Sequence, residues 1–157
     1  MKNLPLLSIS LISIVIANCT FMTNEERNIK LMVQEFMTAV QNNDDRSAHE
    51  ILLDLKGFQI LNPDVSARMD AESFTDAVLA DLVTNYNNFV RYFDGKDIRV
   101  TKFHLGSQWY QYKGFPSFKD SQITVKAGNE TVEFVIRGIV KIDNKWRIVN
   151  LSDNGLF

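Results

Sequence analysis

The sequence has few of the residues from which covalent cross-links and metal sites are built. It contains one cysteine, Cys19, with two histidines and three prolines in 157 residues. A single cysteine cannot form an intramolecular disulfide, and a structural zinc site needs several Cys or His ligands. His49 and His104 lie far apart in the chain. The composition therefore excludes a disulfide scaffold and predicts neither a metal site nor a cofactor.

Long runs of like charge are also lacking. The formal net charge is -2, and 23% of the residues are charged. A nearly neutral balance gives no electrostatic reason to expect nucleic acid as a partner. No run of basic residues occurs that would predict a polybasic membrane patch. Hydrophobic residues make up 45% of the chain, which is ordinary for a globular domain, and its length favours one domain.

The N-terminus carries a short hydrophobic segment. Lys2 is the only charged residue before Glu25, and residues 4–17 are apolar or Ser, apart from Pro5. This segment has the length of the central region of a signal peptide and is shorter than the roughly 20 residues of a membrane span. The sequence therefore predicts an export signal over residues 1–18.

The hydrophobic segment ends in Ile16-Ala17-Asn18-Cys19, which resembles the lipobox of bacterial lipoproteins. In that motif a small residue precedes the lipid-modified cysteine, and Asn18 departs from the usual Gly, Ala or Ser. The resemblance implies acyl chains such as palmitate on Cys19, a lipidated tether over residues 19–23, and a membrane-anchored domain in the bacterial cell envelope, outside the cytoplasm. In a Gram-negative cell it favours the outer membrane. The alternatives are an uncleaved anchor, or cleavage elsewhere that leaves Cys19 a free thiol.

Helical periodicity fills the first part of the remaining chain. Thr23 and Glu26 form a predicted capping box at the start of a helix. Steps of three and four between apolar residues continue this helix to residues 42–43. The residues predicted to form its buried stripe are Ile29, Met32, Val33, Phe36, Met37 and Val40.

Two further helices are expected before the period changes. The second is expected to be capped by Asp45 and to run to residue 55, with Gly57 as its terminator. Residues 56–69 are expected to be irregular. The third and longest helix covers residues 70–93, and its two apolar stripes predict that it is covered on more than one side.

From residue 98 the apolar residues alternate with period two, which predicts strands. Gly128-Asn129 and Asp143-Asn144 are two-residue turns, and two such turns in succession favour an antiparallel meander. The expected strands cover residues 98–112, 122–127, 131–142 and 145–151. Together, these patterns predict a single α+β domain over residues 24–157.

Three helices followed by a curved antiparallel sheet resemble the NTF2-like (cystatin-like, SnoaL-like) fold. The resemblance covers residues 25–153, with its best pieces at Gln41-Asn42-Asn43-Asp44 and at residues 135–148. It implies that the helices close one face of a bent sheet of four or more strands around a cone-shaped cavity. The other sheet face is often a dimer surface in that fold. Because the fold hosts many unrelated activities, it does not by itself imply a function.

Polar side chains on the first predicted strand are the candidates for chemistry in such a cavity. His104, Tyr110 and Tyr112 alternate onto one face, and a histidine there could act as a general base near neutral pH. Asp97 or Asp81 could orient it. The alternative is that these side chains pack or form hydrogen bonds at the sheet surface.

Two other features of the predicted sheet could bind a ligand or a partner. Arg137 could hold a ligand carboxylate with two hydrogen bonds, and Tyr112 is the second candidate for ligand binding. The alternative for Arg137 is a solvated charge on the sheet face. Phe103, Leu105 and Trp109 share the opposite strand face, which could contact a second copy of the chain or another envelope protein. The alternative is a solvated sheet face.

Two functions follow from these features. The first is a lipid-anchored, non-enzymatic domain that binds a small ligand or an envelope protein. The second is an NTF2-like isomerase or hydrolase with His104 as general base. The sequence contains no motif that identifies a ligand or a reaction.

Replacement of Cys19 by Ser tests the predicted lipid attachment, because serine cannot take the lipid through a thioether bond. We expect the wild-type chain to incorporate labelled palmitate and to partition with membranes, and the variant to do neither. A C19S variant that partitions with membranes as fully as the wild type would contradict lipidation at this residue.

Overall fold

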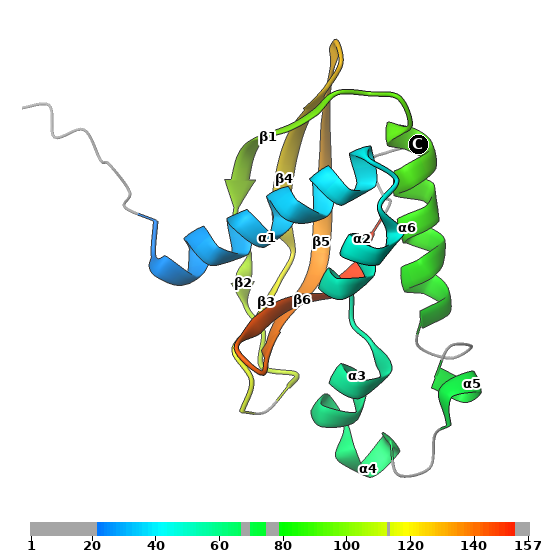
Figure 1. Ribbon diagram of the computed structural model, residues 1–157. Helices are drawn as coiled ribbons and strands as arrows, with labels where there is room; N and C mark the ends of the chain where they lie inside the picture. The colour runs from blue at the N-terminus through cyan, green and yellow to red at the C-terminus, as the bar shows by residue number, and fades with distance from the viewer. Residues whose placement is uncertain (1–21, 67–69, 75–78, 113, 153–157) are drawn as a thin grey trace, which may run out of the picture.

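The computed structural model describes residues 22–66, 70–74, 79–112 and 114–152. The predicted signal and Cys19 lie outside these residues. Within them the chain forms an α+β domain in which helices precede a curved antiparallel sheet (Figure 1). The predicted fold class is therefore confirmed in its main features, although the numbers of helices and strands differ from those expected.

Helix α1 covers Asn24–Gln41 and follows the prediction closely. The side chain of Thr23 accepts a hydrogen bond from the backbone N–H of Glu26 at 3.1 Å, as expected for an N-cap. All six residues of the predicted stripe are buried, and the helix ends with Asn42 as its C-cap. The apolar stripe of α1 faces the sheet and supplies one layer of the core.

The second predicted helix ends earlier than expected. Helix α2 covers Asp45–Ile51, with Asp44 and not the predicted Asp45 as its N-cap, because the carboxylate of Asp44 accepts the backbone N–H of Ser47. After the helix Leu52 is extended. The backbone N–H of Leu53 donates to the carbonyl oxygen of Ile148 at 2.9 Å. This pairing with a strand takes the chain out of the helix, so the prediction of one helix over residues 45–55 was wrong.

Helices also occupy the segment predicted to be irregular. Helix α3 covers Leu55–Leu61, and α4 covers Pro63–Ser66. Asp54 caps α3, because its carboxylate accepts the backbone N–H of Gly57 at 2.7 Å. Gly57 therefore lies inside the first turn of a helix, and its predicted role as a terminator was wrong.

Two described helices lie within the segment that was predicted to be one long helix. Helix α5 covers Ala71–Phe74, and α6 covers Ala80–Phe93, whereas residues 75–78 between them lie outside the described residues. Gly95, at φ 69°, forms the predicted turn after α6. The residues of α6 that are buried against the rest of the domain are Leu82, Tyr86, Phe89 and Phe93.

All the paired strands of the sheet are antiparallel, in the order β1-β4-β5-β3-β2, with β6 also paired to β5. The predicted turns at Gly128 and at Asp143-Asn144 join β4 to β5 and β5 to β6, and all three residues have positive φ. The described strands are β1 Ile98–His104, β2 Ser107–Gln108, β3 Ser117–Lys119, β4 Ser121–Ala127, β5 Glu130–Ile142 and β6 Lys145–Leu151.

The first predicted strand is divided at Gly106. A Cβ atom at this position would lie 1.7 Å from the backbone oxygen of Lys119, so only glycine allows the two strands to approach so closely. Its backbone N–H donates to the hydroxyl of Ser121 at 3.1 Å. Because of this close approach, β1 and β2 form two strands instead of the single one expected over residues 98–112.

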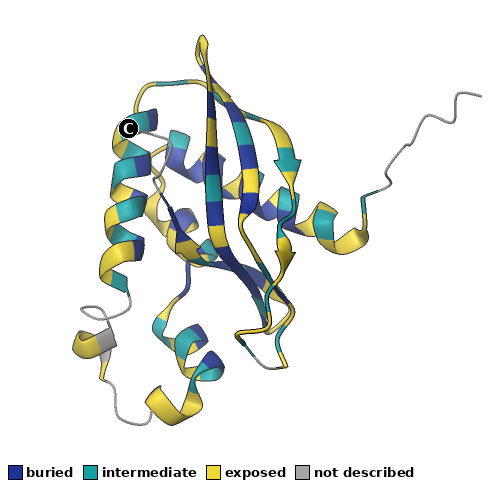
Figure 2. Ribbon diagram, turned by 180° about the vertical axis from the view of Figure 1, so that it is seen from behind, coloured by how far each residue is buried: buried dark blue, intermediate teal, exposed yellow. Residues whose placement is uncertain are grey.

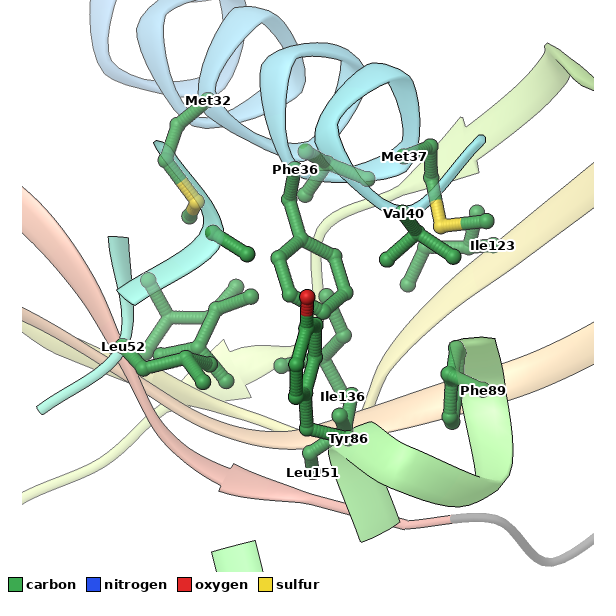
Figure 3. Close-up of a cluster of buried hydrophobic side chains, with 14 of the residues drawn as sticks. Met32, Phe36, Met37, Val40, Leu52, Tyr86, Phe89, Ile123, Ile136 and Leu151 are labelled. Atoms are coloured by element: carbon green, nitrogen blue, oxygen red, sulfur yellow. The ribbon is translucent and has the colours of Figure 1, made fainter. Parts of the chain in front are cut away.

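Aromatic side chains fill the space between the helices and the sheet. Phe36 of α1 contacts Tyr86 and Phe89 of α6, and Phe89 meets the ring of Phe134 edge-on at 4.9 Å. Figure 3 shows Phe36, Tyr86 and Phe89 among the other buried side chains of the core, and Figure 2 shows the alternation of buried and exposed residues along the strands. The inner face of the sheet is thus packed with side chains where the NTF2-like resemblance implies a cavity.

Substitution of Gly106 by alanine tests the close approach of the strands. The added Cβ must displace the backbone at Lys119, and overpacking of this kind costs about 1–3 kcal/mol of unfolding free energy. Urea unfolding of G106A measures this loss, with S107A at the neighbouring exposed residue as control. Equal midpoints for the two variants would contradict this account of the strand break.

Candidate ligand-binding groove

A solvent-open groove with a volume of about 930 Å³ lies between α1, α2 and the start of β6. Helix α1 lines the groove with the stripe of residues that faces away from the sheet, which includes Asn28, Leu31, Glu35 and Thr38. These residues recur at intervals of three and four, so they lie on one helix face. Figure 1 shows α2 and β6 beside this helix.

The groove combines an apolar floor with a polar rim. Met32, Ala39 and Trp146 line it and are buried, whereas Leu31 is 50% exposed. The exposed side chain of Leu31, which has polar neighbours, is an apolar surface that a bound ligand could contact. The amide, hydroxyl and carboxylate groups that surround these residues belong to Asn28, Gln34, Glu35, Thr38, Asn42, Asp44, Ser47 and Glu50.

Trp146 contributes the least expected feature of the groove. The residue is only 8% exposed, and its indole Nε1 has no hydrogen-bond partner among the described residues. The ring is held in place by Phe118, whose centroid lies 5.8 Å away. A buried donor without a partner costs about 1–3 kcal/mol. Because this nitrogen is itself buried, a ligand in the groove could pair with it only after a shift of the Trp146 ring or of its neighbours.

Side chains of both positive and negative charge lie at the rim of the groove. Arg147 donates a hydrogen bond to the backbone oxygen of Glu50, which joins β6 to α2. Lys145 lines the same end of the groove. On the opposite side, hydrogen bonds from the hydroxyl and the backbone N–H of Ser47 lower the pKa of Asp44. The rim therefore suits a ligand that carries polar groups as well as an apolar part.

The α2 wall of the groove is fixed to α6 by a small polar cluster. The hydroxyl of Tyr86 donates to the carboxylate of Asp45 at 2.7 Å, and the ring of His49 meets Tyr86 edge-on at 5.5 Å. Burial, followed by the hydrogen bond to Asp45, raises the pKa of the Tyr86 phenol. This cluster positions the wall without lining the groove itself.

The structure does not bring the predicted catalytic residues together. His104 is exposed and pairs with Gln122, which is also exposed. Asp97 lies 4.0 Å from Arg99, and Tyr110 is 78% exposed, with its hydroxyl donating to Gln108. None of these three candidates lines either of the two described cavities. Their positions give the hypothesis of catalysis at His104 no support.

The other predicted residues are also dispersed. Tyr112 is half-buried and contacts the edge of Trp109 at 5.1 Å. It does not share a strand face with Tyr110, because β2 ends at Gln108. Arg137 is exposed and lies 3.9 Å from Asp120.

Asp81 is exposed on α6. Phe103 and Leu105 are half-buried and pack against the core, so much of their apolar surface is already covered. Trp109 is half-buried as well and approaches Gly138 closely.

Neither a metal site nor a spanning helix is found in the described part of the chain. Within residues 22–66, 70–74, 79–112 and 114–152, no group of three His, Cys, Asp or Glu residues is arranged to hold a metal ion. Among those residues, no helix has both the length and the apolar character that a membrane crossing requires.

Comparison with protein-family models found no match, and comparisons with curated proteins and with solved structures found none either. The relationship to NTF2-like domains and the lipoprotein assignment therefore remain predictions. The groove has to be interpreted from its own geometry.

Sequence reasoning missed the groove because its parts come from three elements. One local signal was available. Leu31 is an apolar residue on the polar stripe of α1, out of phase with the buried residues Met32 and Phe36. The burial of Trp146 beside that stripe depends on how β6 packs and leaves no trace in the local sequence.

Substitution of Tyr86 by phenylalanine tests the α2–α6 cluster through pH. The folded protein holds the phenol proton more tightly than the unfolded chain does, so this contribution to stability is complete below the ordinary pKa of 10.0 and is lost as the pH rises above it. We expect Y86F to lose about 1 kcal/mol at neutral pH with its hydrogen bond.

Between about pH 8 and pH 11, the unfolding free energy of Y86F should then fall less than that of the wild type. Burial also raises the pKa of Tyr112, so some alkaline loss should persist in the variant. Urea unfolding at several pH values measures both slopes. Identical slopes would show that Tyr86 does not carry the effect.

Proposed function

We propose that this domain is a non-enzymatic binding domain that takes a small amphiphilic ligand in the groove between α1, α2 and β6. The groove itself, with its apolar floor and polar rim, carries the proposal, and the unpaired indole N–H of Trp146, one of the residues that line it, supports it. Buried polar groups in folded proteins are almost always paired, so an exception beside a large groove favours a missing acceptor.

The dimensions and lining of the groove support a small ligand. Its volume of about 930 Å³ lies within the range of about 300–1,000 Å³ of small-molecule sites. Leu31 and Met32 offer apolar contact, while Arg147 and Asp44 offer charges of opposite sign at the rim. The ligand class that fits is an amphiphile with an apolar part and an acceptor oxygen, such as an ester or amide carbonyl, close to it.

We also propose that the domain is attached to the envelope by lipid on Cys19, outside the cytoplasm. The N-cap of α1, Thr23, follows four residues after Cys19, so such an anchor would hold the domain close to the membrane surface. Anchors with two or more acyl chains bind membranes stably. The helices before a bent antiparallel sheet also support kinship with NTF2-like domains, with the binding site moved from the filled interior to the outside of α1.

Fluorescence of Trp146 tests ligand binding at the groove. The chain has two tryptophans, so W109F leaves Trp146 as the only indole reporter. With the amphiphilic probe 1-anilinonaphthalene-8-sulfonate, we expect saturable binding that changes the emission of Trp146.

Two further substitutions on α1 locate the probe. In the W109F background, T38Y places a ring in the groove, where it should occupy part of the space that the probe fills. Binding of the probe should weaken at least about tenfold, because the probe loses apolar contact area worth more than about 1.4 kcal/mol. R27Y places the same ring on an exposed residue of α1 that does not line the groove, and it should bind as the parent does. Equal affinity of T38Y and R27Y would contradict binding in the groove.

A further inference from the structure

The two halves of the chain differ strongly in charge. Residues 22–95, the part of the chain that contains the described helices, include thirteen acidic and six basic residues. Residues 96–152, the part that contains the described strands, include ten basic and five acidic residues. An asymmetry of this size between two layers gives the domain an acidic side and a basic side, although its net charge is small.

The strand register concentrates basic residues on the outer face of β1 and β4. Arg99 lies directly opposite Lys126, and Lys102 lies opposite Thr124. Residues paired across strands point to the same face of a sheet, and all three basic side chains are exposed. We call Arg99, Lys102 and Lys126 the basic strip. Like charges directly opposite each other destabilise a sheet, so the strip is costly to keep without a counter-charge.

Neighbouring acids neutralise the strip only in part. The carboxylate oxygen Oδ2 of Asp97 lies 4.0 Å from Nε of Arg99, which is the longest distance that still counts as an ion pair. Both side chains are largely exposed to solvent. Glu133, on the same face, accepts a hydrogen bond from the hydroxyl of Thr124 at 3.4 Å. Among the described residues, Lys102 and Lys126 form no ion pair.

We infer that the basic strip is a docking surface for an anionic phospholipid bilayer. The N-terminal end of α1 extends past the β1 edge of the sheet in both views (Figures 1 and 2), and α1 packs against β1. The lipid anchor proposed above, on which the choice of a bilayer as partner rests, would therefore leave the chain on the side of β1. Each basic residue that lies near an anionic membrane surface increases the affinity of the protein for that membrane about fivefold.

This orientation would also keep the ligand groove accessible. The groove lies on the helical side, where three acidic residues, Glu35, Asp44 and Glu50, and two basic residues of β6, Lys145 and Arg147, line it. An anionic surface attracts the basic strip more strongly than this mixed lining, so the groove would open away from the bilayer. The sequence predicted no basic membrane patch, because the strip is assembled from two strands and forms no run along the chain.

Binding to vesicles tests the basic strip without the lipid anchor. The residues of the core lie between Ile29 and Leu151, so a chain that begins at residue 20 keeps the whole described core. We expect it to co-sediment with vesicles of phosphatidylcholine mixed with phosphatidylglycerol at low salt, and not with phosphatidylcholine alone. Added salt should release it, because the attraction is screened.

Matched triple variants separate the strip from net charge. R99Q/K102Q/K126Q should weaken binding to the anionic vesicles about a hundredfold, at about fivefold for each charge. R46Q/K56Q/R91Q removes the same charge from exposed residues of the helices and should bind nearly as the wild type does. Circular dichroism checks that both variants remain folded.

Three outcomes would overturn this inference. The first is no binding to anionic vesicles at low salt, and the second is equal loss in the two triple variants. The third is binding of a soluble polyanion, such as duplex DNA or polyglutamate, as tightly as the vesicles and with the same dependence on the strip. That result would replace the bilayer by another acidic partner.

Discussion

Packing of α1 and α6 onto the inner face of the sheet is the constraint on which the rest of the structure depends. Phe36, Phe89 and Phe134 meet at its centre, and each is at most 2% exposed. Truncation of a buried phenylalanine costs about 3–5 kcal/mol, a large part of the stability of a domain this size. Because this cluster packs the inner stripe of α1 against the sheet, the outer stripe of the same helix is left to line the groove.

The hydrogen bond between Leu53 and Ile148 links that core to the groove. It ends α2, ties the following chain to the edge of β6, and holds Trp146 two residues away beside α1 and α2. Arg147 strengthens the same junction through the backbone oxygen of Glu50. The groove is thus a consequence of how the helical layer joins the last strand.

Local signals in the sequence predicted the parts of the fold that local physics determines. The stripe of α1, the cap at Thr23 and the turns at Gly128 and Asp143-Asn144 all depend on residues close together in the chain. The early end of α2 could not be read in this way, because Ile148 lies 95 residues beyond Leu53. The same limit applies to the site. The groove and the basic strip form only where separate elements of the fold meet. The candidates on the first predicted strand, such as His104, rest instead on the alternation of residues along one strand.

The NMR signal of the Trp146 indole proton, followed during titration with the amphiphilic probe, tests the central claim most directly. We expect this proton to move from the position of an unbonded N–H to that of a hydrogen-bonded one, while the ring signals of Phe89 and Phe134 stay in place. Movement of those core rings with an unchanged Trp146 signal would place the ligand inside the domain and contradict the account.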